Sequence, residues 1–142
     1  MFSKPPGRVS IVIFFFAGLA LLALYGCSSS VDNPSARVTD TISDVLQPGK
    51  ISPAHPFVVS TRGELDIKLA TLTPPFANPL VLLLGLIGTN GACSFTSQQA
   101  VLTGNNISYG LVDAGSYCVA LGDSTNGVLT TNESFTLTVV HP

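Results

Sequence analysis

Short segments in which apolar and polar residues alternate set the strongest limit on how this chain can fold. The segment ELDIKLAT, residues 64–71, carries aliphatic side chains at every second position and charged ones between them. A period of two with one polar face is typical of a half-buried β-strand. The closing segment ESFTLTVVHP, residues 133–142, alternates in the same way. Both segments are therefore predicted to be strands with one face in a core.

From about residue 40 onward the chain consists of such segments, separated by turns rich in Gly, Pro and Asn. The apolar segment PLVLLLGLIG, residues 79–88, is expected to be a central strand covered on both faces, and a short buried helix is the alternative. Its β-branched valine, its two glycines and the flanking prolines favour the strand. Roughly eight strands with no long amphipathic helix predict an all-β fold, a single antiparallel β-sandwich of the jelly-roll or immunoglobulin-like kind.

The apolar side of each alternating segment is expected to face the core. In SYCVAL, residues 116–121, this leaves Cys118 and Ala120 facing outward. The predicted core consists of Phe57, Val59, Leu65, Ile67, Leu69, Tyr117, Val119, Leu121, Phe135, Leu137 and Val139.

The amino-terminal leader ends at a Gly–Cys junction. Two basic residues precede an apolar stretch, residues 9–24, which has the length of a signal peptide and falls short of the roughly 20 apolar residues of a membrane span. The junction LYGC, residues 24–27, resembles the lipobox of bacterial lipoproteins. The resemblance implies that residues 1–26 are a cleaved signal peptide and that the thiol of Cys27 carries a diacylglyceryl anchor. An uncleaved anchor or an ordinary signal peptide is the alternative.

Residues 27–39 are small, polar and without apolar periodicity, and they are expected to form a tether. About a dozen flexible residues span roughly 20 Å. Serine follows Cys27, which by resemblance to Gram-negative sorting signals implies the outer membrane. The folded domain, residues 40–142, is thus expected to be exported and held at a membrane through the lipid on Cys27.

Cys93 and Cys118 remain after the leader and its cysteine. An even pair in an exported chain predicts a disulfide. Free thiols and a metal site are the alternatives, although zinc usually takes four ligands in close pairs. Because Cys118 is expected to face outward, the bridge is predicted on the outer face or rim of a sheet, within reach of reductant.

The residue inventory argues against several function classes. Without the leader, four basic and eight acidic residues give a net charge of −4, which is unfavourable for binding nucleic acid. The two histidines, His55 and His141, each precede a proline. We expect a structural role for His55 and a solvated position for His141. Since a hydrolytic triad needs a histidine beside a nucleophile and a carboxylate, the sequence predicts neither an enzyme nor a cofactor.

Two ligand-binding alternatives stay open. The segment DSTNG, residues 123–127, offers Asp123 and Asn126 as candidate calcium ligands. It does not match the EF-hand spacing, and a hairpin turn explains it equally well. A glycan is the other candidate ligand, although the chain has no Trp to act as an aromatic platform.

The segments at residues 46–72, 107–123 and 134–142 together resemble the bacterial pre-peptidase C-terminal domain family. They share its pattern of Gly turns, alternating aliphatic strands and a closing aromatic strand. The resemblance covers roughly residues 40–142 and implies a jelly-roll β-sandwich that accompanies secreted enzymes; immunoglobulin-like and fibronectin-like modules share much of the pattern. The expected function is a non-catalytic binding or structural role in the envelope, with an envelope protein or a glycan as the expected partner. The alternative is a calcium- or glycan-binding accessory module.

Overall fold

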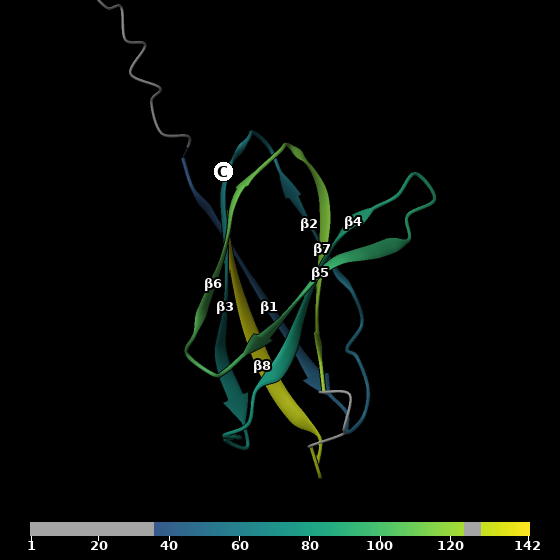
Figure 1. Cartoon of the computed structure of the whole chain (residues 1–142), viewed down its shortest axis with the longest axis vertical. Coiled ribbons are helices and arrows are strands. Elements are labelled where there is room, and N and C mark those ends of the chain that lie inside the picture. Colours follow the sequence, from purple (N-terminus) through teal and green to yellow (C-terminus); the bar gives the residue numbers. More distant parts are fainter. Residues whose placement is uncertain (1–35, 124–128) are drawn as a thin grey trace, which may run out of the picture. The chain divides into compact units, whose positions relative to one another are not determined.

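Two four-stranded antiparallel sheets face each other in the computed structural model, which describes residues 36–123 and 129–142 (Figure 1). Sheet I has the strand order β1-β8-β3-β6, and sheet II has the order β2-β7-β4-β5. The strands are β1 (Val38–Leu46), β2 (His55–Val59), β3 (Gly63–Thr73), β4 (Leu80–Ile87), β5 (Cys93–Val101), β6 (Asn106–Val112), β7 (Gly115–Gly122) and β8 (Glu133–His141).

The order of the strands is that of a jelly roll. β4 and β5 are neighbours in sheet II, whereas the other strands that follow one another in the described chain lie in opposite sheets. Eight strands in two interleaved four-stranded sheets are the jelly-roll arrangement, and they differ from the seven-stranded immunoglobulin order. The predicted antiparallel β-sandwich is therefore confirmed, and its topology is the jelly-roll alternative.

The first and last strands of the domain lie side by side in sheet I. β8 pairs with β1 over nine residues, from Val38 opposite His141 to Leu46 opposite Glu133. The other edge of β8 pairs with β3. β8, the yellow ribbon in Figure 1, is therefore one of the two inner strands of sheet I.

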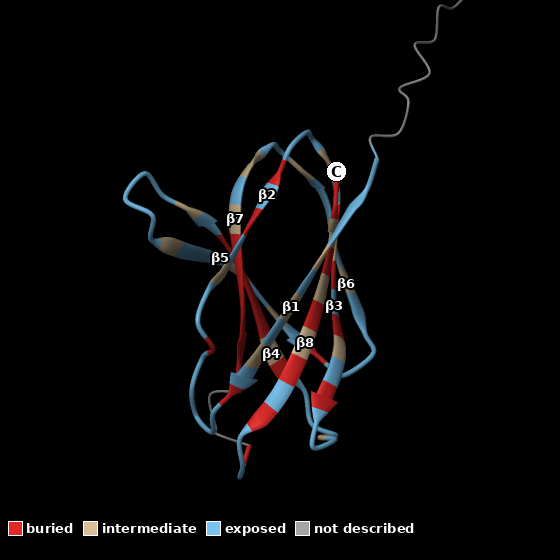
Figure 2. Cartoon of the chain, turned by 180° about the vertical axis from the view of Figure 1, so that it is seen from behind, coloured by how far each residue is buried: buried red, intermediate tan, exposed pale blue. Residues whose placement is uncertain are grey.

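The inner faces of the two sheets supply the core, seen as the red segments of Figure 2. Ten of the eleven predicted core residues are buried, with at most 5% of their surface exposed. Tyr117 is the exception, because it is only half-buried and packs against the edge of the core beside Phe57. Further buried side chains that were not predicted are Leu46, Leu72, Leu80, Leu82, Leu84, Val101 and Leu129.

β4 is a central strand buried on both faces over much of its length, as its apolar composition predicts. Gly85 has no room for a side chain, since a Cβ there would lie 2.3 Å from the backbone oxygen of Ser94. A β-bulge between Leu84 and Gly85 interrupts the pairing with β5 at the same place. The beginning of β5 therefore lies over Gly85. Beyond it, the tip of the β4–β5 hairpin extends away from the sandwich (Figures 1 and 2).

Strand β1 begins at Val38, two residues before the predicted start of the domain. The leader, Cys27 and most of the tether lie outside the described residues, so the lipid anchor stays a prediction. In the described part of the chain, no helix has the length and apolar character needed to cross a membrane.

Candidate functional site

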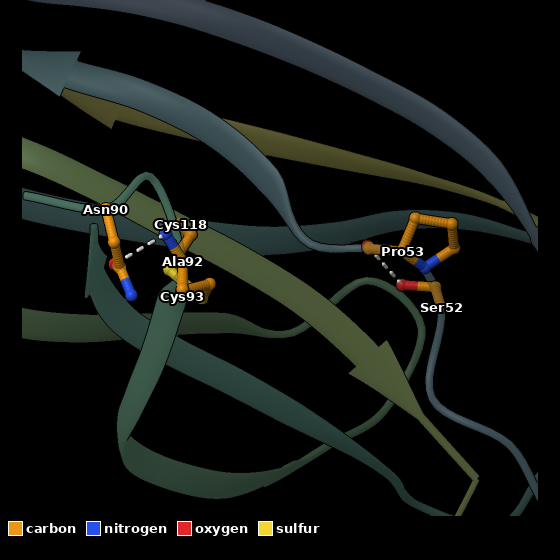
Figure 3. Close-up of a disulfide and its surroundings, with 6 residues drawn as sticks. All are labelled: Ser52, Pro53, Asn90, Ala92, Cys93 and Cys118. Carbon is orange, nitrogen blue, oxygen red and sulfur yellow. Dashed lines mark hydrogen bonds between the residues drawn. A yellow bond between two sulfur atoms is a disulfide. The ribbon is translucent and has the colours of Figure 1, made fainter. Parts of the chain in front are cut away.

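A disulfide joins Cys93, the first residue of β5, to Cys118 in β7 (Figure 3). The Cα atoms are 6.0 Å apart, within the usual range for a disulfide. The predicted pairing is confirmed. Because β4 lies between β5 and β7 in the sheet, the bridge spans β4, and the space left by Gly85 opposite Cys118 lets the start of β5 come close enough.

The prediction that the disulfide is exposed to solvent is wrong at Cys118. The residue lies outside the core cluster, as its outward position predicts, but only 1% of its surface is exposed. Ala120, the next outward residue of β7, is fully buried. The start of β5 lies over Gly85, the residue opposite Cys118, and covers the Cys118 side chain. Sequence alternation gives the direction of a side chain but not what lies on top of it.

Both histidines are paired with aspartates of β1. His55 Nε2 lies 2.9 Å from Asp44 Oδ2, and His141 Nε2 lies 3.0 Å from Asp40 Oδ2. The prediction that His141 is solvated is wrong, since only 3% of its surface is exposed. Its ring also contacts the ring of Phe57, with centroids 5.5 Å apart. The expected structural role of His55 agrees with its place, because it joins β2 of sheet II to β1 of sheet I.

Each histidine–aspartate pair supplies two of the three side chains that a hydrolytic triad needs. A triad also needs a nucleophile within hydrogen-bonding reach of the imidazole. Among residues 36–123 and 129–142, no hydroxyl or thiol is hydrogen-bonded to either ring, and His141 Nδ1 instead lies 3.1 Å from the oxygen of Pro142. The geometry suits a structural clamp in which each aspartate orients one ring and ties β1 to its neighbours.

Asp40 and Asp44 were not predicted as the partners of the two histidines, although the sequence contained a signal. In VTDTISDVL, residues 38–46, these aspartates occupy the same side as Ile42 and Leu46. An acid on the inward side of a strand needs a partner, because burying an unpaired charge is costly. The two histidines of the chain were the candidate partners.

Asp123 binds backbone amides at the end of β7. Its Oδ2 accepts hydrogen bonds from the N–H groups of Gly49 at 2.8 Å and Leu129 at 3.1 Å. Its own N–H donates to the oxygen of Lys50. The carboxylate thus fixes the turn after β1 against the chain that follows β7. Asn126, the other calcium candidate, lies outside the described residues.

No three His, Cys, Asp or Glu side chains of the described residues come together in a group that could hold a metal ion. Glu133 is a further buried acid, with 3% of its surface exposed, and the Thr131 hydroxyl donates to its Oε1 at 3.3 Å. In the described part of the chain its Oε2 meets no hydrogen-bond donor. The calcium site stays an untested prediction.

A hollow of about 350 Å³ lies on the outer face of sheet I. The side chains around it come from β1, β3 and β8, and most of them carry hydroxyls. The hydroxyls of Ser43 and Thr136 are 3.1 Å apart, which extends a hydrogen-bonding surface across two strands. The lining residues are Ser43, Asp44, Val45, Thr71, Thr73, Ser134, Phe135 and Thr136.

Charged side chains are distributed unequally between the two sheets. Sheet I carries Asp, Glu and Lys on its strands, whereas the four strands of sheet II contain no Asp, Glu, Lys or Arg. Arg37, just before β1, pairs with Asp66 and lies 3.9 Å from Glu64 on β3. The hydrogen bond from the Arg37 guanidinium lowers the pKa of Asp66 below its usual value. Ion pairing therefore fastens the start of the domain to sheet I.

Comparison with known proteins supports the fold and goes no further. No family model and no curated protein matches the chain. A solved structure of the Yersinia pseudotuberculosis-derived mitogen matches over 75% of this chain and 88% of that chain, with 10% identity and a TM-score of 0.50. A structure of Bacillus endospore appendages, described as disulfide-linked pili, covers the same shares at 13% identity and a TM-score of 0.31. The likeness to the mitogen shows a small β-sandwich fold alone.

Proposed function

We propose that this chain is an exported, lipid-anchored protein of the bacterial envelope with a non-catalytic binding or structural role. The observation that carries the proposal is the Cys93–Cys118 disulfide, because disulfides persist in oxidising compartments outside the cytoplasm. It agrees with a leader that ends in the lipobox-like LYGC at residues 24–27. Both histidines are paired with aspartates in clamps that join strands. This pairing supports a structural role for the two histidines, the side chains on which a catalytic triad would depend.

The resemblance to the pre-peptidase C-terminal domain family is part of the proposal. The jelly-roll strand order agrees with the fold that this resemblance implies. In that family the module accompanies secreted enzymes. In this proposal it stands behind a short lipid tether and acts beside partners already present at the membrane surface.

Acylation of the full chain tests the anchor. The protein is expressed in a Gram-negative host with labelled palmitate, and we expect label on the wild type and none on Cys27→Ser. Ser28→Ala is the matched control, because it changes the neighbouring residue and keeps the acceptor thiol. Equal labelling of the wild type and Cys27→Ser would refute the lipid anchor. Recovery of the wild type in the cytoplasm with free thiols at Cys93 and Cys118 would refute export.

A glycan-binding role is the second candidate, favoured by the hydroxyl-lined hollow on sheet I. Threonine hydroxyls can donate and accept hydrogen bonds, as sugar recognition requires. The test is a glycan array with the wild type, Thr71→Val and the control Thr41→Val, which lies on the same sheet outside the lining. Binding that Thr71→Val abolishes and Thr41→Val preserves supports this role, and an array without any hit refutes it.

The calcium alternative has a separate test. A ligand that prefers the native state raises its melting temperature. A calcium site therefore predicts a higher melting temperature in calcium than in chelator, lost in Asp123→Asn. Equal melting temperatures for the wild type in both buffers would end this alternative.

A further inference from the structure

Two lysines of the described chain have no ion-pair partner. Arg37 and Arg62 each pair with a carboxylate. Among residues 36–123 and 129–142, no carboxylate lies within ion-pairing distance of Lys50 or Lys68. Both lysines are exposed. Their ammonium groups are therefore available to an anionic ligand.

Lys68 borders the hydroxyl-lined hollow on sheet I. Its neighbours in β3, Ile67 and Leu69, are fully buried, so Lys68 points to the outer face of the sheet. It lies opposite Thr138 of β8, and Thr136, the next outward residue of β8, lines the hollow. Successive outward residues of a strand are about 7 Å apart, a distance that a lysine side chain can cover. A ligand in the hollow is therefore within reach of Lys68.

Lys50 lines a second hollow that adjoins the first. This hollow of about 440 Å³ lies between the end of β1 and the chain that leads to β2, and Gln47 and Ser52 add polar side chains to its lining. The two hollows share Asp44 and Val45 of β1. Since β1 is an edge strand of sheet I, the hollows meet around its end. One extended ligand can therefore contact both.

The charge left uncommitted around the two hollows is positive. Among the described residues that line them, Asp44 is the one that carries a carboxylate. Its Oδ2 lies 2.9 Å from His55 Nε2, and its Oδ1 accepts a hydrogen bond from the N–H of Val45 at 2.7 Å. Both oxygens of Asp44 thus have partners inside the domain, whereas Lys50 and Lys68 have no ionic partner.

Three hydroxyl residues cross the first hollow in one row. Ser43 of β1 and Thr71 of β3 both lie opposite Thr136 of β8. We call these three residues the hydroxyl row. Because neighbouring strands are about 4.8 Å apart, the row extends over about 10 Å. Each hydroxyl donates one hydrogen bond and accepts up to two, which matches the hydroxyls of a sugar.

The face between the lysines is long enough for several linked sugar rings. Lys68 lies opposite Thr138, and Val45 lies opposite Ser134, four residues away along β8. The distance from Lys68 to Val45 is therefore roughly 13 Å along the strands and about 10 Å across them. Val45 is 45% exposed where the two hollows meet, and it offers an apolar contact to the face of a sugar ring.

We propose that the two adjoining hollows bind an acidic glycan, a sugar chain whose hydroxyls meet the hydroxyl row and whose anionic groups meet Lys50 and Lys68. This inference rests on the glycan-binding role proposed above and adds the charge of the ligand. An acidic peptide carries the same charge but lacks the hydroxyls that the row pairs with, so a glycan is the better match.

The test measures the binding of matched sugars to the full-length protein by titration calorimetry, in a detergent without a sugar headgroup. Hexamers of mannuronate and of galacturonate are each compared with the same hexamer after its carboxylates have been reduced to alcohols. At low salt we expect the acidic form of at least one pair to bind about three- to thirtyfold more tightly than its neutral form, as two exposed ion pairs allow. Added salt should reduce this preference, because it screens the charges.

Variants locate the charges that cause the preference. Lys50→Gln and Lys68→Gln should each reduce it, and the double variant should remove it while still binding the neutral hexamer as the wild type does. Arg62→Gln is the matched control, because it removes one exposed charge outside both hollows, and it should keep the preference. Thr71→Val should weaken the binding of both forms.

The outcomes separate this inference from the glycan-binding role. A wild type that binds none of the hexamers overturns the inference, and neutral hits on the glycan array would still support the role. Equal affinity for acidic and neutral hexamers, lost in Thr71→Val, keeps the role and overturns the inference. A preference that Arg62→Gln reduces as much as the lysine variants do also overturns it. So does hexaglutamate that binds as tightly as the acidic sugars and is unaffected by Thr71→Val.

Discussion

The disulfide offers the sharpest quantitative prediction. Cys93 and Cys118 close a loop of 25 residues, and the loss of chain entropy in the unfolded state predicts a stabilisation of about 3.5 kcal/mol at 25 °C. A domain of this size has a free energy of unfolding of about 5–15 kcal/mol. Cys93→Ala combined with Cys118→Ala should therefore remove a large share of the stability without changing the fold.

Urea unfolding followed by circular dichroism measures this loss. Three samples are compared: the oxidised wild type, the reduced wild type and the double alanine variant. The two samples without the bridge should unfold at lower urea concentrations, with free energies of unfolding lower by about 3.5 kcal/mol. The reduced wild type keeps both sulfur atoms, so it separates the entropy of the cross-link from packing lost at the buried Cys118. A double variant within about 0.5 kcal/mol of the oxidised wild type, the scatter of neutral substitutions, would refute the reasoning.

Three further predictions concern the core, the space at Gly85 and the ion pair before β1. Leu137→Ala should cost about 2–5 kcal/mol, because the side chain is fully buried, whereas Thr136→Ala on the outer face should cost less than about 1 kcal/mol. Gly85→Ala should cost at least about 1–3 kcal/mol, since its Cβ meets backbone atoms, and should slow closure of the disulfide. Arg37→Ala should destabilise the domain at neutral pH, an effect that disappears as the pH falls through the lowered pKa of Asp66, because the pair contributes stability only while that carboxyl is ionised.

Each of these predictions has a control or a contradicting result. Gly115→Ala adds a Cβ in ordinary contact with Tyr117 and should be nearly neutral; equal losses at both glycines would argue against crowding at Gly85. Similar losses from Leu137→Ala and Thr136→Ala would contradict the assigned core face. A destabilisation by Arg37→Ala that does not diminish as the pH falls through the lowered pKa of Asp66 would contradict the ion pair as its cause.

The alternation of apolar and polar residues was sufficient to predict the strands and most of the core. Alternation in ELDIKLAT and ESFTLTVVHP marked the inward side chains of β3 and β8, because the side-chain period of a strand is fixed by its backbone geometry. The Cys93–Cys118 pairing followed from the number of cysteines and the compartment that the leader implies. These inferences need no knowledge of which segments meet in space.

Features that depend on distant segments could not be read in this way. Cys118 is buried because the start of β5 lies over Gly85, and alternation along β7 carries no trace of that contact. His141 looked solvated because it is the penultimate residue, yet pairing of β8 with β1 places it beside Asp40. The aspartate signal on the inward side of β1 was local and could have been used; the identity of each partner required the sheet order.

The position of β8 between β1 and β3 has a consequence for when this chain can fold. Sheet I has no centre until residues 133–141 have been synthesised, because neither β1 nor β3 has another partner on that side. While β8 is still being synthesised, sheet I therefore cannot be completed. An unfolded chain is also the form that an export channel can translocate. We expect nascent chains that stop before Glu133 to be digested rapidly by protease, and resistance to arise only once β8 is present. A protease-resistant domain in the truncated chains would contradict this order of events.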